Sequence, residues 1–154
     1  MIALYLFWDQ SIKTEKKILS KEVISWAFYD WANSAFATTV IAGFFPIFFK
    51  SFWANSLSDT ESTALLGLAN SLSGFFILIF APFLGALADI TFRKKYMLVF
   101  FMLIGAGSTA SFFFIYEGYW MIAVIAYILA SIGFSGGNIF YDSLIIDVSN
   151  DLSL

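Results

Sequence analysis

Apolar residues form four long stretches in this chain, and short polar breaks separate them. The stretches cover about residues 23–49, 64–88, 96–115 and 119–141. Each is long enough, at the rise of an α-helix, to cross the hydrocarbon core of a bilayer. Backbone polar groups inside that core must be satisfied within the protein, and the shorter, alternating pattern of barrel strands is absent. The pattern therefore predicts an all-α polytopic membrane protein with four transmembrane helices.

The composition agrees with this prediction. Of 154 residues, 60% are hydrophobic, 12% are charged and 20 are Phe. A water-soluble domain of this size could not bury so much apolar surface. The chain has no Cys and no His, which removes disulfides and the usual zinc sites and leaves carboxylates as the proton-carrying groups. We expect no metal, no other cofactor, no nucleic-acid partner and no intramembrane enzyme.

Basic residues gather on one side of the predicted spans. Four precede the first span: Lys13, Lys16, Lys17 and Lys21. Three lie between the second and third spans, namely Arg93, Lys94 and Lys95, whereas only Lys50 lies between the first and second. The positive-inside rule places that side, and both termini, in the cytoplasm. We interpret residues 1–22 as a cytoplasmic segment whose apolar start lies on the membrane surface or results from a misassigned start codon. Residues 150–154 form a cytoplasmic end, and we expect the sequence to be incomplete there.

The first span contains a row of polar residues, which are costly in lipid. Asp30, Asn33, Ser34 and Thr38 are spaced i, i+3, i+4 and i+8, so they share one face of a regular helix. One interpretation is a cavity-lining row that meets a substrate or a proton. The alternative is structural, with Asp30 reaching the cytoplasmic interface or pairing with a basic residue.

The fourth span has a similar row and a group of glycines. Ser131, Ser135, Asn138 and Asp142 again lie on one face. For the serines and for Gly133, Gly136 and Gly137 we favour a helix-packing contact between small residues. Asn138 and Asp142 remain candidates for a polar site. In the third span, Gly105, Gly107, Ser108 and Ser111 also indicate small-residue packing.

Several single residues support more local predictions. Ser62 or Thr63 could cap the second helix, and Pro82 favours a bend within it. We expect the aromatic residues to be mostly lipid contacts and interface residues. This expectation includes four tryptophans near the predicted span ends: Trp26, Trp31, Trp53, Trp120.

The break after the second span has a distinctive order of residues, GALADITFRKK. Gly85 would allow a close helix contact. Asp89 would lie at a helix C-terminus, where an acid is unfavourable unless paired, and Arg93 would be its partner. This segment resembles the signature loop of the major facilitator superfamily, with Gly85, Asp89, Arg93 and Lys94 matching the pattern. Ile90 and Phe92 depart from it, where a basic residue and a turn glycine are usual.

Two further segments narrow the resemblance. The first span, SWAFYDWANSAFATTVIAGFFPIFFKSFW, resembles the opening helix of the vacuole-effluxer-like branch of that superfamily, a group that includes a fungal vacuolar amino-acid effluxer. The end of the fourth span, from Asn138 to Ser149, resembles the same branch. The resemblance covers about residues 26–149.

The resemblance implies a secondary transporter of twelve helices, of which these four would be the start of the N-terminal six-helix half. It implies that Asp30 and Asn33 line the substrate path and that Gly85, Asp89 and Arg93 form a conformational latch, joined by Asp142 or Asp147. The implied partners are the lipid bilayer, a small polar solute such as an amino acid, and protons, in a bacterial plasma membrane. The alternative is a small four-helix membrane protein that acts as a homo-oligomeric exporter or a structural subunit.

Overall fold

The structure, a computed structural model, describes residues 21–90 and 93–153, with side chains described as far as Ile145. The apolar start of residues 1–20, interpreted above as a surface segment, lies outside the described residues. So do residues 91–92 of the predicted latch loop, residue 154, and the side chain of Asp147.

The first span is one continuous rod that changes its helical geometry along its length. It consists of α2 (Lys21–Ala35), the π-helical η1 (Phe36–Phe44), α3 (Phe45–Phe48) and the π-helical η2 (Phe49–Trp53). The π-helical turns are wider than those of an α-helix: the N–H of Phe45, for example, donates to Val40 O, five residues back. Pro46 follows at the start of α3, where its missing N–H breaks the regular ladder of hydrogen bonds. The rod continues four residues beyond the apolar stretch that predicted it.

The second span, α4 (Asp59–Ile90), begins earlier than predicted. Ser58 caps it: Glu61 N donates to Ser58 Oγ over 3.3 Å, and Ser58 N donates to Glu61 Oε2 over 2.9 Å. This reciprocal pair is a capping box, so the prediction that Ser62 or Thr63 caps the helix is wrong. The polar connection from the first span is therefore residues 54–58 rather than 50–63.

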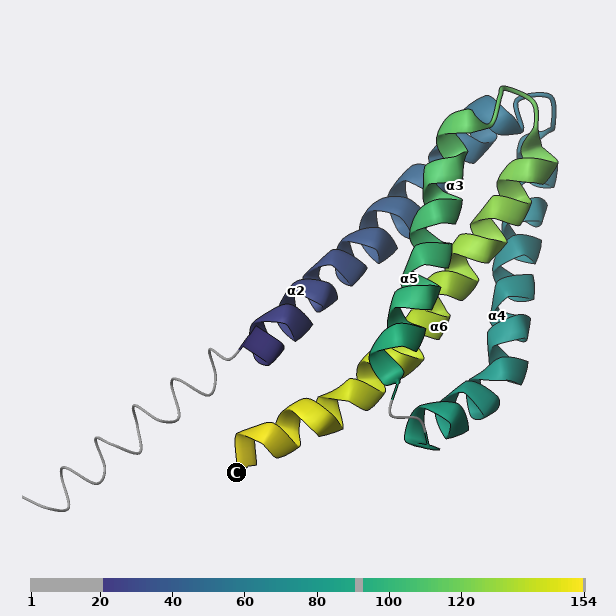
Figure 1. The fold of residues 1–154 in the computed structure, drawn as a ribbon. Coiled ribbons are helices and arrows are strands. Elements are labelled where there is room, and N and C mark those ends of the chain that lie inside the picture. The colour runs from purple at the N-terminus through teal and green to yellow at the C-terminus, as the bar shows by residue number, and fades with distance from the viewer. Residues whose placement is uncertain (1–20, 91–92, 154) are drawn as a thin grey trace, which may run out of the picture.

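The remaining spans are α5 (Lys94–Ser111), which continues as the 3₁₀ turn η3 (Phe112–Phe114), and α6 (Trp120–Ser153). Four helices of the described chain are long and apolar enough to cross a membrane, which confirms the predicted fold class. Pro82 lies inside α4, and the last turns of α4 bend away from its upper part (Figure 1). Large apolar side chains such as Phe83 and Leu103 are exposed, as suits a surface that faces lipid.

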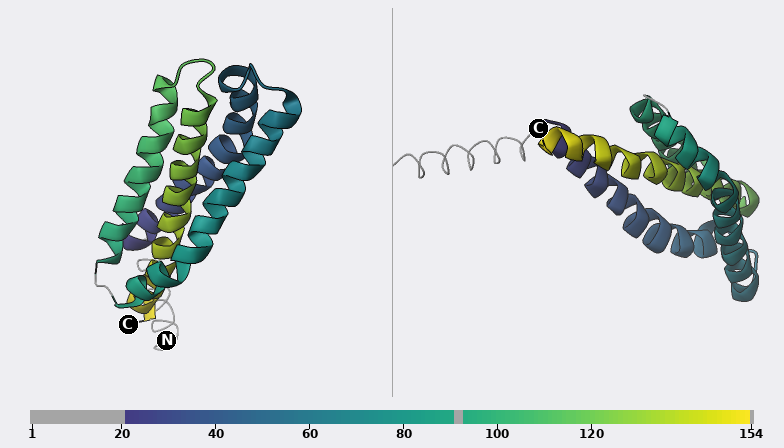
Figure 2. Two further views of the ribbon diagram at one scale, coloured as in Figure 1. Left: turned by 90° about the vertical axis from the view of Figure 1, so that its right-hand side faces the viewer. Right: turned by 90° about the horizontal axis from the view of Figure 1, so that it is seen from below.

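The helix α6 is at the centre of the arrangement and packs against both α4 and α5 (Figures 1 and 2). Its contact with α5 is closest at two glycines. A Cβ added at Gly133 would lie 2.5 Å from Gly105 N and 2.7 Å from Gly105 Cα, so the backbones meet directly, which confirms the predicted small-residue contact. At Gly136 an added Cβ would collide with the Phe101 ring. At Gly107 it would meet nothing within 4 Å, so the small-residue packing expected at Gly107 is wrong for the residues that the structure describes.

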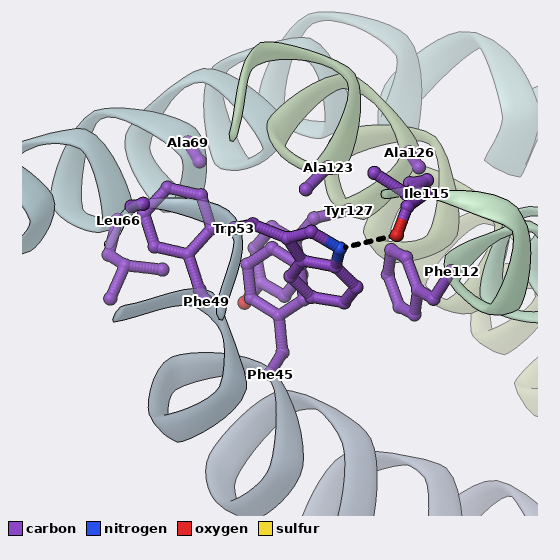
Figure 3. Packing of buried hydrophobic residues seen from close by; sticks show 11 residues of the cluster. Phe45, Phe49, Trp53, Leu66, Ala69, Phe112, Ile115, Ala123, Ala126 and Tyr127 are labelled. Carbon is purple, nitrogen blue, oxygen red and sulfur yellow. Dashed lines mark hydrogen bonds between the residues drawn. The ribbon is translucent and has the colours of Figure 1, made fainter. Parts of the chain in front are cut away.

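An aromatic cluster joins the first span to the other three at the end of the molecule that carries the 54–58 connection (Figure 3). Phe45, Phe49 and Trp53 are fully buried there, against Tyr127 of α6 and Phe112. Trp53 Nε1 donates to Ile115 O over 3.1 Å, which satisfies the indole inside an apolar surrounding. Trp53 is therefore a core residue, and its assignment to a membrane interface is wrong.

The glycine contact gives the first testable prediction. Gly133→Ala forces the backbones of α5 and α6 apart, and overpacking of this kind typically costs about 1–3 kcal/mol. We expect a clearly lower thermal unfolding temperature in detergent. Gly107→Ala is the matched control, since that position is open, and it should unfold near the temperature of the parent chain. Equal temperatures for the two variants would contradict the packing.

Candidate functional site

The first and fourth spans, far apart in sequence, meet through a pair of amide side chains. Asn33 Nδ2 of α2 donates to Asn138 Oδ1 of α6 over 2.7 Å. Each belongs to one of the two polar rows predicted from the sequence, so the fold joins the rows at this pair. An amide hydrogen bond of this kind removes two polar groups from contact with lipid and fixes the relative position of the two helices.

Three aromatic rings stack about one helical turn away from this amide pair, toward the basic end of the molecule, which is the end with Arg93. The ring of Tyr141 on α6 lies between those of Trp26 and Tyr29 on α2, with ring centroids 4.8 Å and 5.0 Å apart and interplanar angles of 11° and 28°. Tyr141 is only 5% exposed. Its hydroxyl and the Trp26 indole Nε1 are both buried. The indole has no hydrogen-bond partner among the described residues, whereas the hydroxyl interacts with the Asp30 carboxylate. Trp26 is therefore part of an internal contact, which corrects its assignment to the interface.

Two carboxylates border this stack. Asp30 follows Tyr29 in α2 and Asp142 follows Tyr141 in α6, and both side chains are exposed. The charges of both reach the Tyr141 hydroxyl electrostatically. Carboxylates and uncharged hydroxyl, indole and amide groups thus lie together where α2 meets α6. A solute or a proton that entered here would meet both acceptors and donors.

The remaining members of the two rows are not drawn into this contact. Thr38 Oγ1 donates to Ser34 O over 3.0 Å within the same helix, and both residues are exposed. The wide π-helical turns begin at Phe36 and change the angular spacing of the residues that follow. Thr38, eight residues after Asp30, therefore no longer lies on the face that a regular helix would give it. In α6 Ser131 is buried and Ser135 half-buried, in line with the packing interpretation.

A cavity of about 200 Å³ opens beside the amide pair. Tyr29, Asn33 and Phe36 line it from the first span, Met102 and Gly105 from α5, and Gly133 from α6. Its lining is largely apolar, with the amide of Asn33 and the Tyr29 side chain as polar groups. At about 200 Å³ the cavity is smaller than the roughly 300–1,000 Å³ of typical small-molecule sites.

The predicted latch residues lie at the basic end, around the connection from α4 to α5. Asp89 and Arg93 are exposed, and Lys94 Nζ donates to Ser143 O of α6 over 3.3 Å. A Cβ added at Gly85 would meet nothing within 4 Å. The expected close helix contact at Gly85 is therefore wrong for the part of the chain that the structure describes. Lys94 links this loop to the same helix that carries Asn138 and Tyr141.

The sequence interpretation missed the tyrosines. Besides the Tyr141 stack, Tyr127 Oη donates to Asn70 Oδ1 of α4 over 2.7 Å. A signal was available, because Trp26, Tyr29 and Asn33 follow one another at i, i+3 and i+7, and Asn138 and Tyr141 at i, i+3. Rings and amides on one helical face indicate a contact rather than a lipid surface. Among the described residues no group of three or more Asp, Glu, His or Cys could hold a metal ion.

The fold and this site define a class: a multi-pass α-helical membrane protein in which polar side chains meet between the first and fourth spans. Residues 52–151 match the family described as vacuole effluxer Atg22 like. The chain is also 41% identical over 134 residues to the "Uncharacterized MFS-type transporter YxiO" of Bacillus subtilis (strain 168), covering 86% of this chain and 31% of that protein. The chain belongs to the vacuole effluxer Atg22-like family, which confirms the resemblance.

The chain spans less than a third of the length of this curated relative. No solved structure matches it.

The amide pair supports a second prediction. In a double-mutant cycle of Asn33→Ala and Asn138→Ala, the two substitutions should be less than additive, with a coupling of about 0.6 kcal/mol or somewhat more, the usual value for hydrogen bonds between membrane helices. Unfolding in detergent measures it. A parallel cycle of Asn33→Ala with Asn70→Ala is the control, because Asn70 bonds to Tyr127 instead. Additive effects at Asn33 and Asn138 would contradict the contact.

Proposed function

We propose that this chain is the N-terminal part of a secondary active transporter, or acts as one, and moves small polar solutes across a membrane by alternating access. Amino acids are the first candidate solutes. The observation that carries the proposal is the polar contact of α2 with α6 through Asn33 and Asn138, in a chain whose family and curated relative are transporters. Polar groups held inside a membrane bundle typically mark a substrate or ion path.

The proposed path follows α2 and α6. Asn33 and Asn138 supply the amide groups, with Ser34 and Thr38 along the exposed side of the first span and Asp142 at the end of the fourth. Asp30 is the proposed proton carrier, since the chain has no His and a carboxylate is then the group able to exchange a proton. It is exposed and borders the aromatic stack, so a proton could reach it while the contact persists.

The basic end is the proposed cytoplasmic side, with both termini there. Lys21, Arg93, Lys94 and Lys95 lie at this end, and the excess of basic residues fixes orientation. In the proposed cycle Gly85, Asp89, Arg93 and Lys94 form the latch that holds one conformation through charge pairing. The bond from Lys94 to Ser143 O supports this role, because it joins the loop to the helix that contacts the first span.

The proton-carrier role predicts a loss of coupling. Asp30→Asn keeps the size and polarity of the side chain but cannot ionise, so solute flux in proteoliposomes should no longer respond to an imposed pH gradient. Exchange of solute without a gradient should persist. Asp59→Asn, an exposed carboxyl at the opposite end of the molecule, serves as the control and should leave coupling intact. Coupled flux in Asp30→Asn would refute the assignment.

The latch predicts a difference between two neighbouring basic residues. Arg93→Ala should slow transport several-fold, because it removes a charge that the proposed latch pairs. Lys95→Ala removes a positive charge two residues further on, in the first turn of α5, but lies outside the matched pattern, and it should transport normally. Orientation in the membrane, measured by labelling from each side, should stay unchanged in both. Unchanged flux in Arg93→Ala would argue that the loop serves topology alone.

A further inference from the structure

A second polar contact joins α4 to α6, in the half of the molecule away from the basic end. Tyr127 Oη of α6 donates to Asn70 Oδ1 of α4 over 2.7 Å. The Tyr127 side chain is only 2% exposed and lies inside the aromatic cluster (Figure 3). Its ring stacks on that of Phe45, with centroids 4.0 Å apart and an interplanar angle of 18°. This packing holds the hydroxyl in a fixed position.

The bond from Tyr127 sets the orientation of the Asn70 amide. A side-chain amide has an oxygen that accepts hydrogen bonds and an NH₂ group that can donate two. Tyr127 donates to the oxygen, so the NH₂ group is left for another partner. The Asn70 side chain is exposed, and it makes no other hydrogen bond among the described residues. Two donors are therefore available at the surface of α4.

The neighbours of Asn70 on its own helix leave this amide uncovered. Gly67 and Gly74 lie one turn before and one turn after it on the same face of α4. Both are exposed, and a Cβ added at either would meet nothing within 4 Å. A polar group within a membrane span is costly against lipid, so such groups typically face protein or a water-filled space. The amide is thus open to a partner that the described residues do not supply.

Tyr127 also extends the polar row of α6 that contacts the first span. It precedes Asn138 by 11 residues, or three helical turns with about 20° left over, so the two share a face about 16 Å apart along the axis. Asn138 bonds to Asn33 at one end of this face, and Tyr127 stacks on Phe45 of the same span at the other. Asn70 therefore lies beside the proposed path, where α4 borders α6.

We propose that Asn70 is a solute-binding residue and that Tyr127 is its positioning residue. Tyr127 holds the amide oxygen, and the amide N–H groups donate to an acceptor oxygen of the transported solute, such as an oxygen of a carboxylate. The inference rests on the proposed function in taking α2 and α6 to border a solute path, and it adds α4 to that path.

The first test asks whether water reaches Asn70. The chain has no Cys, so Asn70→Cys introduces a single thiol. A charged, water-soluble methanethiosulfonate is applied to both sides of proteoliposomes, and it reacts with the thiolate, which forms in water and not in apolar surroundings. Leu68→Cys is the matched control. Leu68 is 60% exposed at nearly the same depth, but it lies about 200° away around the helix.

The cysteine at position 70 should react about tenfold faster, or more, than the one at position 68, because only the first borders a water-filled path. Equal rates would show that lipid or a further helix covers Asn70. That result would overturn the inference, and it requires no knowledge of the solute.

The second test separates solute binding from a structural tie. Uptake of a labelled mixture of ordinary amino acids into proteoliposomes gives a half-saturating concentration. In Asn70→Ala this concentration should rise about tenfold or more with the maximal rate little changed, as for one lost hydrogen bond to a charged group. Tyr127→Phe keeps the stacked ring and the amide donors but no longer fixes them, so the rise should be smaller. Ser71→Ala, at the next residue, is the control and should behave like the parent.

Stability provides the comparison that interprets these values. Asn70→Ala and Tyr127→Phe lose the same hydrogen bond, so both should unfold in detergent at similarly lowered temperatures. A purely structural role would also raise the half-saturating concentration equally in both. Such equality, or a parental value in Asn70→Ala, would overturn the inference.

Failure of the proposed function gives a different result, because the parent chain would then take up none of the mixture. The labelling contrast between positions 70 and 68 still decides the inference in that case. A clear contrast without uptake would reject amino acids as the solutes and retain Asn70 as a donor that faces water. Equal labelling together with uptake would retain the transport function and reject the role of Asn70.

Discussion

The burial of Trp53 is the constraint on which the arrangement of the first span depends. In a membrane the hydrophobic effect does not drive helices together, so helix association relies on close packing and on hydrogen bonds between helices. Trp53 provides both: it is fully buried, and its indole donates to Ile115 O between the third and fourth spans. Phe45 and Phe49 complete the contact with Tyr127. This cluster fixes one end of the first span and leaves the other end to be placed by weaker, polar contacts.

Packing among the other helices follows a different rule. The third and fourth spans approach so closely that Gly105 and Gly133 touch through their backbones. Such contacts are made over a large area and leave little room for sliding. The polar contacts of the first span, from Asn33 to Asn138 and from the Tyr141 stack, are few by comparison. A stable group of three helices thus stands beside one helix that is attached mainly at its ends, an arrangement that suits a protein which must change conformation.

The fold class could be predicted from the sequence, since hydropathy identifies the spans. The hydrogen bond between the two amides of Asn33 and Asn138 could not, since helical spacing identifies only which residues share a face. The helical periodicity placed Asn33 and Asn138 in candidate rows. It could not show that Thr38 leaves the row, because the wide turns of Phe36–Phe44 change the angular spacing of residues in a way that a regular helical period does not describe. Nor could it separate tryptophans in the core from tryptophans at an interface: Trp53 is buried and Trp31 is 72% exposed, yet both lie near predicted span ends.

The length of the first span between its two attachments has a mechanical consequence. From Trp53 to Asn33 the rod has about 20 residues, or about 30 Å at the rise of an α-helix. Pivoting by about 10° around the tryptophan would displace the asparagine by about 5 Å at that radius, far more than the 2.7 Å bond to Asn138 can stretch. The span therefore works as a lever, in which a small angular change at one end of the molecule decides whether the polar groups at the other end touch or separate.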